Sequence, residues 1–123
     1  MALLATLLVC VVAAIHVYFV VLEMVLWRTP RGMRSFGTDQ AFADRSAPLA
    51  ANQGLYNGFL VAGLVWGLLA ADPVGFQVRI FFLGCAIVAG LFGAATVSRR
   101  ILVVQAVPAA LALAAVLVAG NVA

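Results

Sequence analysis

Long apolar runs constrain the fold of this chain more than any other feature. Four of them, separated by polar residues, cover about residues 2–26, 49–70, 78–97 and 101–118. At about 1.5 Å per residue, a helix of roughly 20 residues crosses the hydrocarbon layer of a bilayer. Hydrophobic residues make up 67% of the chain and charged residues only 9%, which excludes an ordinary soluble domain. We therefore predict an all-α, polytopic membrane four-helix bundle that forms a single transmembrane domain over residues 1–123.

The arginines predict the orientation of this bundle. All seven basic residues are arginines, and four crossings place six of them on one side: Arg28, Arg31, Arg34, Arg45, Arg99 and Arg100. Arg79 alone lies on the other side. Because basic residues are enriched in cytoplasmic loops, we expect segment 28–48 to be a cytoplasmic loop, with a short helix around Thr38 to Arg45, and both termini to lie on the outer side. The net charge of +3 reflects a scarcity of acids, so we expect no nucleic-acid partner.

A cluster of polar side chains opens the second apolar run, in the stretch Asn52-Gln53-Gly54-Leu55-Tyr56-Asn57-Gly58. On a helix, four of these side chains fall within roughly 140° of one another: Asn52, Gln53, Tyr56 and Asn57. An amide group in hydrocarbon needs a hydrogen-bond partner. The stripe therefore predicts either contacts with neighbouring helices or a small polar pocket that binds a ligand.

Two titratable residues lie within the first apolar run. Glu23 is the only acid inside any run and His16 is the only histidine, and their spacing places both on one helix face about 10 Å apart. Glu23 either pairs with Arg28, Arg31 or an incoming asparagine, or it takes and gives a proton. His16 either bonds to a neighbouring helix, acts as a general acid and base, or ligates a haem or metal.

Further polar groups lie at the cytoplasmic ends of the runs. Trp27 follows the first run as an interface anchor. In the fourth run, Pro108 leaves the carbonyl of Val104 without its usual donor, next to Gln105. The predicted topology brings the polar residues of three runs to a similar depth. We expect them to share one chamber in the cytoplasmic half of the bundle, with His16 at its floor.

Several of these motifs together resemble a known family of small bacterial membrane proteins. They are His16 with Leu22-Glu23, Trp27, Pro30-Arg31-Gly32, the run LAANQGLYNGFLVAGL from Leu49, FFLGC from Phe81, and the Gln105/Pro108 pair. The chain is similar over nearly its whole length to the family known as domain of unknown function 1304. The resemblance implies a four-span protein of about this size in the bacterial inner (cytoplasmic) membrane. It does not indicate which activity the protein has.

The residue inventory favours a membrane protein that binds a small lipophilic molecule and transforms it by proton transfer, as an isomerase does. The expected catalytic residues are His16, Glu23 and Tyr56, and the expected substrate-binding residues are Asn52, Gln53, Asn57, Gln105 and Trp27. No nucleotide loop, nucleophile elbow or metal-binding cluster is evident, so we expect no cofactor or metal, with haem at His16 as the alternative.

Two other functions fit the same residues. One is a dimeric, proton-coupled exporter of small amphipathic cations, with Glu23 as the exchange site. The other is a non-catalytic membrane subunit that packs helices against a partner. In each case we expect membrane lipid as a partner, and we expect a homo-oligomer.

Overall fold

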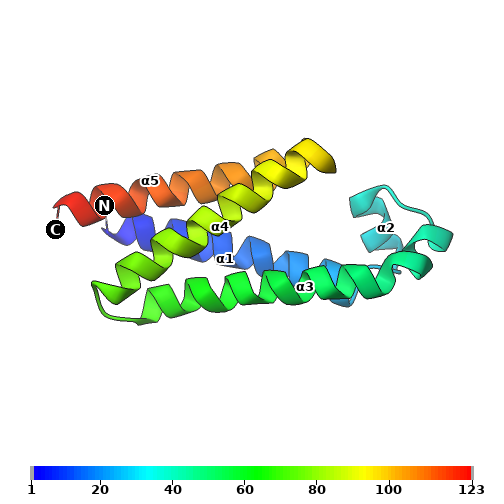
Figure 1. Cartoon of the computed structure of the whole chain (residues 1–123), viewed down its shortest axis with the longest axis horizontal. Helices are drawn as coiled ribbons and strands as arrows, with labels where there is room; N and C mark the ends of the chain where they lie inside the picture. Colours follow the sequence, from blue (N-terminus) through cyan, green and yellow to red (C-terminus); the bar gives the residue numbers. More distant parts are fainter. Residues whose placement is uncertain (1, 123) are drawn as a thin grey trace. The chain divides into compact units, whose positions relative to one another are not determined.

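The computed structural model describes the backbone of residues 2–122 and the side chains of residues 2–120. Every regular element in this range is a helix, which confirms the prediction of an all-α fold. The order is α1 (Ala2–Met24), α2 (Pro30–Phe36), α3 (Gln40–Leu69), α4 (Val74–Thr96), the π-helix η1 (Leu102–Ala106) and α5 (Val107–Val122) (Figure 1).

Among the residues that the structure describes, three helical stretches are long and apolar enough to cross a membrane. They are Ala2–Met24, Val74–Thr96 and Leu102–Gly120. α3 does not join this set, because the amides Asn52, Gln53 and Asn57 interrupt its apolar sequence. The chain thus has the composition and the helices of a membrane protein.

The second predicted run begins earlier in the structure than the sequence suggests. The sequence predicts a loop over 28–48 with a short helix around Thr38 to Arg45. The structure does have helix there, but it is the start of α3, which begins at Gln40 and continues through Pro48. Pro48 has no amide hydrogen to donate to the carbonyl of Asp44, but the loss of one hydrogen bond does not end a helix that packing holds. Within the predicted loop, α2 forms a second, shorter helix.

The helices group into two compact units. The first comprises residues 1–15 and 60–123, and its core is built from small and branched apolar side chains. Val9 of α1, Leu64 of α3 and Leu83 of α4 are completely buried. Two residues of α5, Ala109 and Ala112, are buried in the same core. Alanines three residues apart on α5 let this helix approach its neighbours closely, and it packs along α4 (Figure 1).

Glycines in this unit mark the closest helix contacts. A Cβ atom added at Gly67 would lie 2.7 Å from Cγ of Arg79, and the guanidinium of Arg79 donates to the Gly67 carbonyl at 2.7 Å. A Cβ atom at Gly90 would lie 2.7 Å from the backbone nitrogen of Ala106 in η1. These positions therefore require glycine for the observed packing.

The second unit comprises residues 16–59, with the end of α1, all of α2 and the first part of α3. Thr29 begins α2: its hydroxyl accepts from the amide of Gly32 at 3.3 Å and donates to the carbonyl of Leu26 at 2.6 Å. Pro30 follows at the first helical position, where its missing amide hydrogen has no cost. A Cβ atom at Gly32 would collide with the Leu26 carbonyl, so the Pro-Arg-Gly motif sets this tight connection.

Candidate functional site

The carboxylate of Glu23 is the most distinctive polar group of the second unit. It lies in the last turn of α1 and is 8% exposed. The side-chain amide of Asn57, on α3, donates to its Oε1 at 2.5 Å. A Cβ atom added at Gly54 would run into Met24 and would lie 3.3 Å from Cβ of Glu23. The glycine therefore lets α3 approach α1 closely enough for the amide to reach the carboxylate.

None of the arginines neutralises Glu23 in the part of the chain that the structure describes. Arg28, one of the two arginines that the sequence offers as partners, instead donates to Asp44 at 2.8 Å. Of the three partners that the sequence offers to Glu23, the asparagine is the one observed, as Asn57. Glu23 is thus a buried carboxylate whose hydrogen-bond partner is a neutral amide.

Trp27 takes part in a second link between the end of α1 and α3. Its indole nitrogen donates to the hydroxyl of Ser46 at 3.0 Å, and its ring lies 4.8 Å from that of Phe36. Together with the Arg28–Asp44 pair, this contact fixes how the segment after α1 runs along α3. Trp27 therefore lies at a different level of α3 from Glu23, which faces Asn57.

His16 lies two helical turns before Glu23 on α1. Its side chain is fully buried, and its ring meets Phe19 edge to face at 5.3 Å between centroids. Seven residues of α-helix separate it from Glu23 by about 10 Å along the axis, too far for direct proton transfer. Any exchange between the two groups requires a bridging molecule.

The polar stripe of α3 does not turn as a whole toward α1. Asn57 faces Glu23, whereas Asn52 and Gln53 are exposed and Tyr56 is 60% exposed. The Tyr56 ring packs edge to face with Phe59 of the same helix at 5.6 Å. Among the predicted residues of this stripe, the structure therefore pairs only Asn57 with Glu23.

Gln105 belongs to the first unit, where it is buried within the π-helix η1. The amide of Val107 bonds to the carbonyl of Leu102, five residues back, which is the π-helical pattern. Pro108 follows Val107 and has no amide hydrogen to donate to a backbone carbonyl. The sequence predicts a disturbed hydrogen bond here but not the π-helix, which turns Gln105 and Ala106 into the interior.

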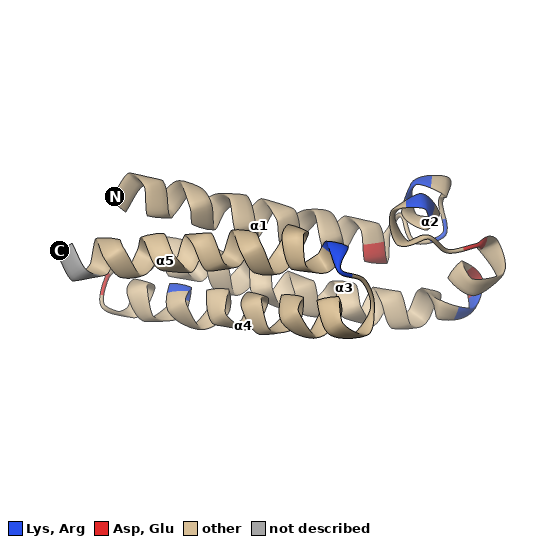
Figure 2. Ribbon diagram, turned by 90° about the horizontal axis from the view of Figure 1, so that it is seen from above, with Lys and Arg blue, Asp and Glu red and all other residues tan. Residues whose placement is uncertain are grey.

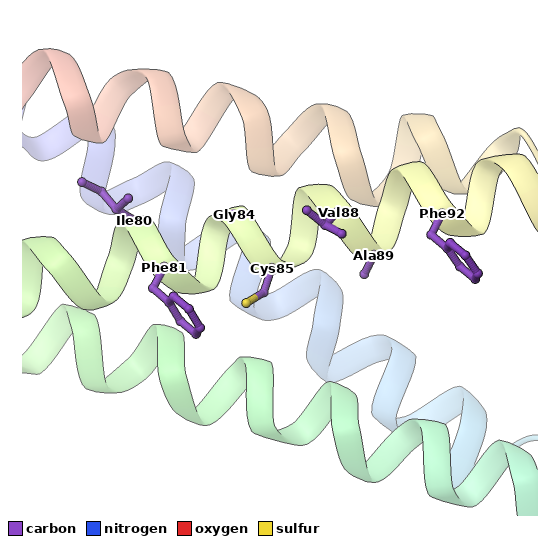
Figure 3. A pocket seen from close by; sticks show the side chains of 7 residues that line it. All are labelled: Ile80, Phe81, Gly84, Cys85, Val88, Ala89 and Phe92. Carbon is purple, nitrogen blue, oxygen red and sulfur yellow. The ribbon is translucent and has the colours of Figure 1, made fainter.

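Two surface depressions are lined by neither Glu23 nor His16. One, of about 700 Å³, runs along a single apolar face of α4 (Figure 3) and is lined by Ile80, Phe81, Gly84, Cys85, Val88, Ala89 and Phe92. The other, of about 400 Å³, lies at the connection of α2 to α3 and is lined by Gly37, Thr38, Asp39, Phe42 and Arg45. The second one was not predicted from the sequence, although its charged residues, Asp39 and Arg45, follow a turn at Gly37.

Within the described residues, no three side chains of His, Cys, Asp or Glu come together as a metal site would require. A haem ligand at His16 remains a prediction.

Comparison with characterised proteins and with solved structures gives no match. A family model, by contrast, matches residues 10–117, which is most of the chain and includes every predicted site residue. The resemblance inferred from the sequence motifs is thereby confirmed, and the chain belongs to the family described as "Protein of unknown function (DUF1304)".

Proposed function

We propose that this chain is a four-span protein of the bacterial inner membrane, with both termini outside, that binds a small lipophilic molecule and moves a proton on it. One observation carries the proposal: Glu23 is buried beside the neutral amide of Asn57, while Arg28 is paired with Asp44. A carboxyl group used only to join helices gains most from a cationic partner, and two arginines lie within eight residues of Glu23 in the sequence.

In the proposed reaction, the Glu23 carboxylate removes a proton from one carbon of the bound molecule. The resulting carboxylic acid returns a proton to another carbon, so the product is an isomer and the enzyme is restored. Asn57 holds one carboxyl oxygen in place through its amide. His16 is the proposed second acid and base. Tyr56, Asn52 and Gln53, exposed on α3, are the groups available to hydrogen-bond the ligand.

Solvent deuterium tests this proposal without knowledge of the ligand. Membranes that contain the full chain are incubated in D2O, and lipophilic molecules that co-purify with it are examined by mass spectrometry. A proton-transferring enzyme places carbon-bound deuterium in the retained molecule, and the Glu23→Gln variant does not. The matched control, Asp72→Asn, removes an exposed acid and should leave the deuterium content unchanged. Equal deuterium in wild type and Glu23→Gln would refute the proposal.

The same buried carboxylate also supports the exporter as a second candidate. In that case Glu23 exchanges its proton for an amphipathic cation, and two copies are needed because one chain of this size is too small to alternate its access. Ethidium efflux from vesicles with an imposed pH gradient separates the two functions. Efflux that Glu23→Gln abolishes, together with no deuterium incorporation, would favour the exporter.

A further inference from the structure

The connection between α2 and α3 carries a polar depression that the proposed function does not use. Gly37 ends α2 in the left-handed conformation, with φ of 65°, and Thr38 and Asp39 lead into α3. The depression has a volume of about 400 Å³. Acidic and basic residues both occur in this part of the chain (Figure 2). A surface depression of this size accommodates a small polar group.

The three polar residues of the depression offer different chemistry. Arg45 is exposed and takes part in neither of the two ion pairs of the described residues. The hydroxyl oxygen of Thr38 is buried and has no hydrogen-bond partner there. Asp39 accepts from the amide of Phe42 through Oδ1 at 2.8 Å and forms no ion pair with an arginine. A cation, an anion and an unsatisfied hydroxyl thus line one depression.

Neighbouring contacts indicate the level of this depression relative to a bilayer. Ser46, which follows Arg45, accepts the indole hydrogen bond of Trp27. Tryptophan favours the membrane interface, and the apolar part of α3 begins shortly after, at Leu49. In the four-span arrangement proposed above, on which this inference rests, α3 crosses the membrane from Leu49. In that arrangement the depression lies on the polar side of the boundary, within a few helical turns of it, where lipid headgroups are found.

We propose that this depression binds the headgroup of a phospholipid that carries both a phosphate and a primary ammonium group. The phosphate accepts a hydrogen bond from the Arg45 guanidinium, and the ammonium group donates to Asp39. The Thr38 hydroxyl, which is buried in this structure, reaches the phosphate by a rotation of its side chain. Phe42, which is 45% exposed, packs against the apolar part of the lipid next to the headgroup. A purely anionic headgroup fits less well, because Asp39 would repel it.

Native mass spectrometry of the full-length protein in detergent tests the site. The protein is mixed with phosphatidylethanolamine, phosphatidylcholine and phosphatidylglycerol of identical acyl chains. We expect phosphatidylethanolamine to be retained several-fold more than the other two. Arg45→Gln should lower its retention about tenfold, as the loss of a charge-assisted hydrogen bond predicts. Thr38→Val, which keeps the side-chain shape, should lower it by a smaller factor.

Two matched variants make the test specific. Asn caps a helix as well as Asp does, so Asp39→Asn should keep the start of α3 and abolish only the preference for phosphatidylethanolamine over phosphatidylglycerol. Arg34→Gln removes an exposed arginine that does not line the depression, and it should leave retention unchanged.

Three results would overturn the assignment. The first is equal retention of the three lipids by the wild type, and the second is an equal loss in Arg34→Gln and Arg45→Gln, which would indicate general charge attraction. The third is displacement of the lipid by equimolar soluble phosphorylethanolamine, which would identify a soluble phosphate ester as the ligand.

Discussion

The side-chain amide of Asn57 donates a hydrogen bond to Oε1 of Glu23, across 34 positions of sequence and from a different helix. This contact joins the end of α1 to α3, and Gly54 makes it possible. The buried carboxylate therefore has a neutral hydrogen-bond donor as its partner, although several arginines lie nearby in the sequence.

Asn57→Ala should lower the free energy of unfolding by about 1–2 kcal/mol, because the buried carboxylate loses its donor. Adding Glu23→Gln to Asn57→Ala should recover part of that loss, since the remaining amide carries no charge. Unfolding in mixed detergent micelles measures all four members of this double-mutant cycle. Additive effects of the two changes would show that the hydrogen bond contributes nothing.

Gly54→Ala should destabilise the protein by about 1–3 kcal/mol, because the new methyl group would collide with Met24 and approach Glu23. Gly58 provides the control on the same helix, since a Cβ atom there meets nothing within 4 Å. Gly58→Ala should be neutral or stabilising by up to about 1 kcal/mol, as alanine is the better helix former. The same micelle unfolding assay compares the two. Equal effects at both positions would contradict close packing at Gly54.

Gly90→Ala should likewise be destabilising, because its methyl group would lie 2.7 to 2.9 Å from atoms of Ala106 in η1. The backbone of a packed helix yields less easily than a flexible side chain, so we expect a loss of about 2–3 kcal/mol. Gly84→Ala is the control on α4, with nothing within 4 Å of the new atom. A thermal stability assay in detergent that shows the two variants to be alike would refute the contact.

The Arg28–Asp44 pair should make stability depend on pH in the acid range. The amide of Gln40 and then the guanidinium of Arg28 lower the pKa of Asp44 below its ordinary value. A lowered pKa in the folded state means that the contribution is complete above the unfolded pKa and is lost as the pH falls through the folded one.

The unfolding midpoints of wild type and Asp44→Asn, measured against pH, test this dependence. Their difference should be small, because the pair is exposed, and it should vanish on acidification. A difference that grows at low pH would contradict the sign of the shift.

The local sequence pattern was sufficient to predict most of the helices and the family of this protein. The apolar runs predict helices because backbone groups without water must bond within the helix, and the runs that end near Met24, Thr96 and Val118 all correspond to helices. Pro108 predicted a disturbed hydrogen bond, and a π-helix ends two residues before it, at Ala106. The motifs were also sufficient to identify the family.

The partner of each polar side chain was decided only by the tertiary structure. The sequence left Glu23 with arginine or asparagine as its neighbour, and it placed four polar side chains of α3 on one stripe. The rotation of α3 about its axis and its register along α1 turned Asn57 toward Glu23 and left Tyr56 exposed. The rotation and the register of α3 depend on how closely its backbone approaches that of α1, and Gly54 permits the close approach. A periodic pattern fixes the face of a helix, but contacts between residues distant in sequence fix where that face points.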